Sequence, residues 1–285
     1  MPPPMPATCW KTCAWPGTAR AFMRACCPRS MTRRRRALGI DGVEEGVLAM
    51  MVLGRAMPPA ALPAAGPYLP GAAAASTSIG VTGVIQRATS LREEAAPPGE
   101  LIPLPAPVVA GKDLYATIAA RRSERRFGSG PVALETLSSI LDGMAQPPQL
   151  SAAVHANIVV NRVAGLPPGV YRFLPRQHAL VRLRSGDFAT AARSAALSQD
   201  VIGDAAVVLV LSAARVQVLA EGARAYRQVL IEAGLVSERW LLGAAARGMA
   251  ACPVGAFYDD EAAALLGADP KEHWVLHFAA LGLRP

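Results

Sequence analysis

The chain has 285 residues, 52% of them hydrophobic, with 29 Lys and Arg against 21 Asp and Glu. Eight of the basic residues and no acidic residue lie within residues 1–36, so the rest of the chain carries 21 charges of each sign. A nucleic-acid-binding protein needs a basic face on its folded part, and a balanced charge outside residues 1–36 argues against one. No apolar run in the sequence approaches the roughly 18 residues that span a bilayer. We therefore expect neither nucleic acid nor membrane as a partner.

Cysteine usage fits a reducing compartment. Four of the five cysteines lie within the first 27 residues, which leaves Cys252 alone in the remainder. No disulfide framework can form there, and we expect Cys252 to be a small buried hydrophobe. His273 and His277 have no Cys or carboxylate at ligand spacing, so we expect no metal site. These features favour a cytoplasmic protein.

Residues 1–95 and 96–285 differ in composition. Pro, Ala and Gly dominate residues 57–75, a composition typical of disordered low-complexity chain. We interpret residues 1–95 as such an extension and 96–285 as one domain. Two alternatives stay open: Met31 is the true start and the upstream stretch a misreading, or an arginine cluster after Met31 and the apolar run 47–53 form a twin-arginine export signal.

The domain begins with predicted helices and continues with strands. Asp113 is a suitable N-cap for a helix through Ile118, and a second helix follows from the apolar spacing between Leu137 and Met144. β-branched runs separated by turn residues predict strands at 157–163, 170–174, 179–183 and 207–211.

The C-terminal third predicts two helices and two strands. An apolar stripe predicts a long helix over 224–247, ended by Gly248. We then expect a strand at 250–254, a helix capped by Asp259 through Leu266, and a last strand at 274–281. Together the elements predict an α+β fold in which helices flank a mainly antiparallel central sheet.

A basic segment follows the first helix. Arg121, Arg122, Ser123 and Arg125 place guanidinium groups and a hydroxyl within a few residues, and guanidinium forks match phosphate oxygens. The alternative is a solvated helix end, where arginines favour the negative pole of the helix dipole.

A second candidate segment lies between the strand at 250–254 and the following helix. Gly255 and the small Ala256 would allow the backbone to approach a flat ring closely. The alternative is an ordinary turn from strand to helix.

From about Leu101 to Pro285 the chain resembles the FMN-dependent nitroreductase family, and more narrowly the SagB-type dehydrogenases. The resemblance rests on a series of short motifs in family order: Pro103-Leu104-Pro105, Arg121-Arg122-Ser123-x-Arg125-x-Phe127, Val159 to Val163, Gly165 to Tyr171, Tyr226-Arg227, Glu232-Ala233-Gly234, Leu265-Leu266-Gly267 and Leu281-Gly282.

The resemblance implies a nitroreductase-like, interlocked homodimer that holds FMN at the subunit interface and transfers hydride at flavin N5. By position in the motifs, the FMN phosphate and ribityl chain would be bound by Arg121, Arg122, Ser123 and Arg125. Gly255 and Ala256 would lie against the isoalloxazine, where backbone amides help to stabilise reduced flavin.

Three departures from the family pattern bear on the site. The flavin loop at 147–153 is short, and Ser151 is its recognisable contact. On the long helix, Glu238-Arg239 replaces the usual Gln-Asn pair. Ala220 and Glu221 stand where azoline dehydrogenases of the branch have Lys-Tyr. Because azoline oxidation needs a base, Glu221 is the remaining catalytic candidate; the alternative is an exposed helix-capping residue.

Three functions remain open. The first is an FMN oxidoreductase of the SagB type, dehydrogenating azolines in ribosomally made peptides or another small heterocycle. The second is a nitro- or quinone-reducing enzyme with NAD(P)H as electron donor. The third is a flavin-poor degenerate paralogue that serves as a scaffold in a modification complex.

Overall fold

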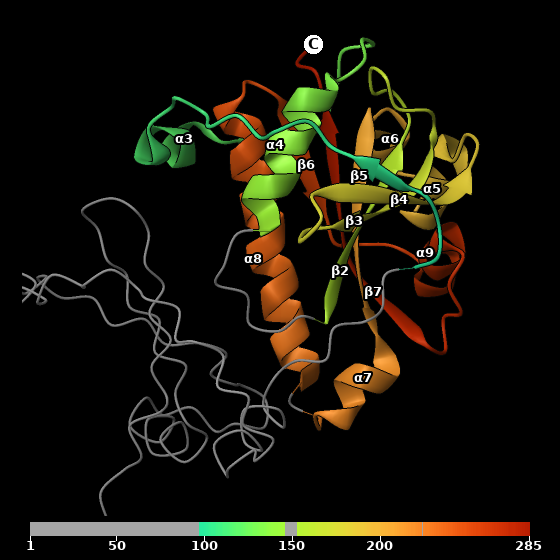
Figure 1. The fold of residues 1–285 in the computed structure, drawn as a ribbon. Coiled ribbons are helices and arrows are strands. Elements are labelled where there is room, and N and C mark those ends of the chain that lie inside the picture. Colours follow the sequence, from blue (N-terminus) through green and yellow to red (C-terminus); the bar gives the residue numbers. More distant parts are fainter. Residues whose placement is uncertain (1–96, 146–152, 224) are drawn as a thin grey trace, which may run out of the picture. The chain divides into compact units, whose positions relative to one another are not determined.

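A seven-stranded sheet is the centre of the fold, which we describe from a computed structural model (Figure 1). The described residues are 97–145, 153–223 and 225–285. The interpretations of residues 1–95 and of Ser151 lie outside this described part. Among the described residues, no helix is both long and apolar enough to cross a membrane.

Every neighbouring pair of strands in the sheet is antiparallel. The spatial order is β1-β4-β3-β2-β5-β7-β6, so β1 and β6 are the edges. The strands are β1 Leu101–Pro103, β2 Val154–Val160, β3 Gly169–Leu174, β4 Ala179–Ser185, β5 Val207–Ala214, β6 Ala250–Val254 and β7 His273–Gly282.

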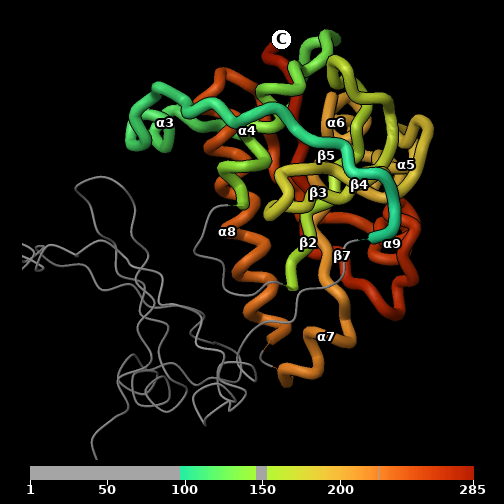
Figure 2. The backbone as a smooth tube through the Cα atoms, in the orientation of Figure 1, coloured from blue at the N-terminus to red at the C-terminus, as the bar shows by residue number. Residues whose placement is uncertain are grey.

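Helices cover both faces of the sheet. In Figures 1 and 2, α4 and α8 lie on one side of it and α5, α6 and α9 on the other, which matches two separate apolar clusters. The helices are α3 Leu114–Ala120, α4 Leu134–Ala145, α5 Ala189–Ala195, α6 Asp200–Gly203, α7 Arg215–Ala220, α8 Ala225–Ala246 and α9 Asp259–Leu266.

The central strand β5 is buried on both faces. Its sequence is an almost continuous apolar run rather than an alternation, and every residue in it is buried. On one face, Trp240 of α8 packs fully buried in the same cluster as Ile140 of α4. The two helices are in contact at Gly243, where an added Cβ would lie at an ordinary van der Waals distance of 3.6 Å from Ile140. The long helix is thereby fixed against the sheet.

Most of the predicted elements are confirmed, with shifted ends. Asp113 caps α3, because its side chain accepts a hydrogen bond from the Ala116 N–H. The role predicted for Asp259 is wrong: Tyr258 occupies the N-cap position without a side-chain bond, and Asp259 is the first residue of α9. Its carboxylate still lies in the first turn, where the helix dipole favours negative charge.

Four elements are absent from the sequence-based prediction. These are β1, α5, α6 and α7, all of eight residues or fewer. Helices this short carry too few turns for an apolar period to appear. β1 is defined by its pairing with β4 rather than by its own pattern, because two of its three residues are exposed.

The buried tyrosine of β3 provides a test of this core. Tyr171 is fully buried, and its hydroxyl donates to the Pro167 carbonyl at 2.7 Å. We expect Tyr171→Phe to lower the free energy of unfolding by ~1 kcal/mol, because a buried acceptor loses its donor. The melting temperature should fall by about 3 °C. Tyr115→Phe, in a ring 62% exposed, is the control and should melt like the wild type.

Candidate functional site

The basic segment runs along the outer edge of β6. Helix α3 ends at Ala120, and its C-cap residue Arg121 has an extended backbone. The Glu124 N–H then donates to the Ala251 carbonyl at 3.0 Å, and the Gly128 N–H donates to the Leu283 carbonyl at 2.9 Å. These two hydrogen bonds hold the segment against the sheet at the strand that leads into Gly255.

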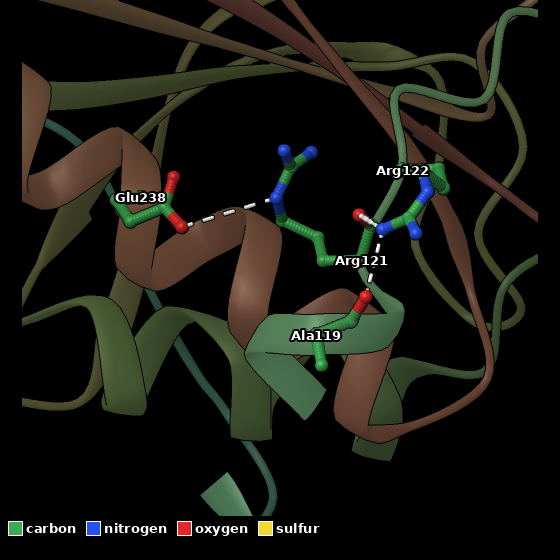
Figure 3. A network of polar contacts seen from close by, with 4 residues as sticks. All are labelled: Ala119, Arg121, Arg122 and Glu238. Carbon is green, nitrogen blue, oxygen red and sulfur yellow. Dashed lines mark hydrogen bonds and ion pairs between the residues drawn. The ribbon is translucent and has the colours of Figure 1, made fainter. Parts of the chain in front are cut away.

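Arg121 points toward the long helix. Its Nε lies 3.9 Å from Oε1 of Glu238 on α8 (Figure 3). Its Nη1 is buried and has no hydrogen-bond partner among the described residues. A buried donor without an acceptor is costly, so an anion placed at this nitrogen would bind favourably.

Arg122 has a different environment. Its Nη1 donates to the carbonyls of Ala119 and Arg121, both at 2.8 Å (Figure 3). Cationic side chains near a helix C-terminus commonly satisfy its last carbonyls in this way. The contacts of Arg122 therefore agree with the alternative interpretation, in which this arginine stabilises the C-terminal end of helix α3.

The charges of Arg125 and Arg121 reach the buried thiol of Cys252 on β6. Burial raises the pKa of the Cys252 thiol, and the positive charges of Arg125 and then Arg121 act in the opposite direction. The half-buried Ser123 lies between them in the chain. The structure therefore places the predicted phosphate-binding segment along β6, beside Ala251 and Cys252.

The loop after β6 is held by hydrogen bonds from other segments, and it has free space beside Gly255. Gln199 Nε2 donates to the Ala256 carbonyl at 3.1 Å, and the Tyr258 N–H donates to the Ala195 carbonyl at 2.8 Å. Gly255 and Ala256 are themselves exposed. A Cβ added at Gly255 would meet no atom within 4 Å. This loop therefore has a fixed backbone and free space beside it.

Two further residues belong to this neighbourhood although no sequence motif singled them out. Arg284 Nη2 lies 3.8 Å from Oε1 of Glu124, which adds a cation beside the basic segment. Gln199 is separated from Ala256 by 57 positions in the chain. Arg284 and Gln199 are isolated residues that belong to no sequence motif. Their proximity to the site is therefore visible only in the folded structure.

Among the described residues, Glu221 does not lie beside the basic segment. It is exposed and follows the last residue of α7. Helices α3 and α7 lie at opposite ends of α8 (Figures 1 and 2). The catalytic role of Glu221 stays a prediction, because the described residues do not place it beside the basic segment.

The arrangement suits an elongated ligand with an anionic end and a flat end. Arg121, Arg125 and Arg284 supply positive charge beside β6, and Gly255 and Ala256 supply open backbone beyond it. Among the described residues, no group of three or more His, Cys, Asp and Glu is arranged to hold a metal ion.

Comparison with known proteins gives the family. The model of the nitroreductase family matches residues 118–282. The chain is also 31% identical over 175 residues to the putative nitroreductase MJ1384 of Methanocaldococcus jannaschii, covering 57% of this chain and 88% of that protein. The chain therefore belongs to the nitroreductase family of oxidoreductases.

Solved structures agree with this assignment. A putative nitroreductase from Anabaena variabilis is 26% identical with a TM-score of 0.62, covering 66% of this chain. This chain spans only 42% of that protein. A putative nitroreductase from Ralstonia eutropha shares the fold at 22% identity and a TM-score of 0.54, covering 69% of this chain and 97% of that one.

The Cys252 thiol reports whether Arg125 lies near β6 in solution. Because burial favours the neutral thiol, a heteronuclear NMR titration of the Cys252 Cβ signal should give a pKa above that of a free cysteine. Arg125→Gln should raise this pKa further, since it removes a charge that favours the thiolate. Arg126→Gln removes the same charge from the next position and should leave the titration unchanged. Equal shifts in both variants would contradict the placement of Arg125.

Proposed function

We propose that this protein is an FMN-dependent oxidoreductase that works as a homodimer and transfers hydride at the flavin. The observation that supports the proposal is that residues 121–125 lie along β6, the strand that leads directly into residues 255–256. Each alone is compatible with an ordinary local structure. Together they would form the phosphate-binding and the ring-binding halves of a flavin mononucleotide site.

The basic segment fits the phosphate of FMN. Arg121 has a buried Nη1 available for an acceptor, and Arg125 is exposed four positions further along the chain. Arg284 adds a charge beside Glu124. Charge-assisted hydrogen bonds to a phosphate are roughly twice as strong as neutral ones. Arg121, Ser123 and Arg125 would hold the phosphate end, while Arg122 would stabilise the end of α3.

The loop after β6 fits the ring. FMN bound there supplies an isoalloxazine whose N5 accepts or donates hydride. Gly255 presents no side chain, and Gln199 holds the carbonyl of Ala256, so the loop backbone is fixed before any ligand arrives. Fixed backbone dipoles stabilise charge without reorganisation. Gly255 and Ala256 would thus position the ring and stabilise its reduced form.

The substrate we favour is a heterocycle in a peptide, as in the SagB-type branch. Removing hydride from an azoline also needs a base for the ring proton. Ala220 cannot supply one, and Glu221 lies at the far end of α8 from the basic segment. In this proposal Glu221 acts on the flavin site of the partner subunit.

The position of Glu221 also favours a second candidate, an NAD(P)H-dependent reductase of nitroarenes or quinones, which needs no such base. Stopped-flow reduction separates the two. Bleaching of the bound flavin within seconds by NAD(P)H, followed by reoxidation with a nitroarene or quinone, would select the reductase. Reduction by an azoline peptide, while nicotinamides leave the flavin oxidised, would select the dehydrogenase.

The first test is the visible absorbance spectrum of the purified full chain, followed by heat release and identification of the chromophore. We expect near-stoichiometric FMN and a dimer by light scattering. A folded, colourless dimer that takes up no added FMN would overturn the proposal in favour of the scaffold.

Loss of two arginines should release the flavin. We expect Arg121→Ala with Arg125→Ala to weaken FMN binding by at least about 100-fold, because two charge-assisted contacts of roughly 1.5–3 kcal/mol each are removed. Ultrafiltration followed by flavin fluorescence measures the free fraction. Arg126→Ala is the matched control and should retain FMN. Full retention in the double variant would show that the phosphate binds elsewhere.

A side chain at Gly255 should compete with the ring. Gly255→Leu should keep the wild-type melting temperature of the apoprotein, because nothing occupies the space around its Cβ. The same change should weaken FMN binding at least about tenfold by filling the ring position. Gly111→Leu, also with free space around its Cβ, is the control. Unchanged FMN affinity in Gly255→Leu would remove this loop from the site.

A further inference from the structure

Strand β7 has an edge that β6 leaves uncovered. β7 pairs with β5 from His273 to Leu281. Its pairing with β6 covers only Phe278 to Gly282. Among the described residues, positions 273–277 therefore have a strand neighbour on one side alone. An uncovered edge of this kind presents unpaired N–H and C=O groups to another chain.

The hydrogen-bond pattern identifies which backbone groups point outward. The Arg215 N–H donates to the Glu272 carbonyl at 2.7 Å, one position beyond the pair of Ala214 and His273. In an antiparallel ladder this marks a non-hydrogen-bonded pair. His273 and, two residues later, Val275 therefore direct their backbone groups away from β5. The His273 N–H donates to the Asp269 carbonyl, which leaves the C=O of His273 and the N–H and C=O of Val275 directed toward the open edge.

A groove of about 390 Å³ follows this edge. Four consecutive residues, 273–276, line it. Successive side chains of a strand point to opposite faces, so a groove that meets all four runs along the edge rather than over one face. Tyr226 and Leu230 of α8 form one wall, and Asp259 and Pro270 also line it.

The edge has a β-bulge between Val275 and His277 in its pairing with β5, but no Lys, Pro or acidic residue. Natural edges are commonly blunted by Lys, Pro or inward charges, whereas residues 273–277 read His-Trp-Val-Leu-His. The Trp274 ring makes a T-shaped contact with Tyr226 at a centroid distance of 5.2 Å. Tyr226 and Leu230 are nevertheless 47% and 40% exposed. The wall is thus apolar and accessible.

The position of the open β7 edge indicates which ligand binds there. β6 covers the same side of β7 up to Phe278 and leads directly into Gly255 and Ala256. A strand added at 273–277 would continue the line of β6, with one end directed at the proposed flavin loop. We propose that residues 273–277 and their groove bind an extended segment of the polypeptide substrate by strand addition. This inference rests on the proposed function and gives its substrate a binding mode.

The groove also sets the side chains that the peptide presents. Asp259 is the charged residue among those that line it. The remaining lining offers aromatic and aliphatic surface together with His273. The bound segment therefore has apolar side chains at alternate positions. At the position that faces Asp259 it has no carboxylate, and a basic side chain fits.

The test uses the FMN-loaded full chain and a capped hexapeptide in which valine and threonine alternate after one lysine that carries fluorescein. Fluorescence anisotropy should show saturable binding, and amide exchange at residues 273–277 should slow. The same peptide with N-methyl groups on alternate residues, on the edge that faces β7, should bind at least about tenfold more weakly. It keeps every side chain, but on the edge that faces β7 it replaces backbone donors with methyl groups that block strand pairing, so equal binding of the two peptides overturns the proposal.

Protein variants give the second arm. Trp274→Ala should weaken binding at least about tenfold, whereas Tyr115→Ala, an exposed aromatic on α3, should bind like the wild type. If FMN is retained and no peptide binds, this inference fails alone. If peptide binds in the predicted way to a protein that takes up no FMN, the proposed function fails and the strand-addition site stands. Binding only to monomer released from a dimer would assign the edge to a second copy and overturn the inference.

Discussion

One hydrogen bond, from the Glu124 N–H to the Ala251 carbonyl, joins the basic segment to the sheet. β6 is an edge strand, so its outer carbonyls need partners. Pro253 is compatible with this edge because it has no N–H to leave exposed. By accepting the segment along its outer side, β6 brings Arg121 and Arg125 next to the strand whose end becomes the Gly255 loop. Each half of the proposed flavin site is positioned by the same strand.

The two faces of the sheet contribute differently to the site. On one face, α8 presents Glu238 to Arg121 and holds Trp240 in the core. On the other, α5 and α6 hold the loop through Ala195 and Gln199. The sheet between them is apolar on both faces. The site therefore lies at the rim of the sheet, where backbone groups and long polar side chains remain available.

The sequence predicts the long elements and half of the site. Helix α8 and strand β5 are recognisable because their apolar patterns extend over many residues. The helices α5, α6 and α7 are too short for that, and Asp259 is misplaced by one position because acidic residues favour both the N-cap and the first turn. The motif at 121–125 is found, but its spacing cannot tell that Arg122 turns to the end of α3. Arg284 and Gln199 reach the site through tertiary contacts alone.

Two groups without partners in this fold differ in how strongly they need a ligand. The buried Nη1 of Arg121 lacks an acceptor, and the edge of β7 at Val275 lacks a strand, both among the described residues. A charge-bearing donor left unpaired costs more than a backbone group that water can reach, so the anion site has the stronger need for its ligand. A ligand that satisfies Arg121 stabilises the folded state by mass action. The strand edge, whose backbone groups are neutral, is suited to a partner that binds and leaves. Tight retention near α3 and reversible docking along β7 are what an enzyme with a resident cofactor and a passing peptide requires.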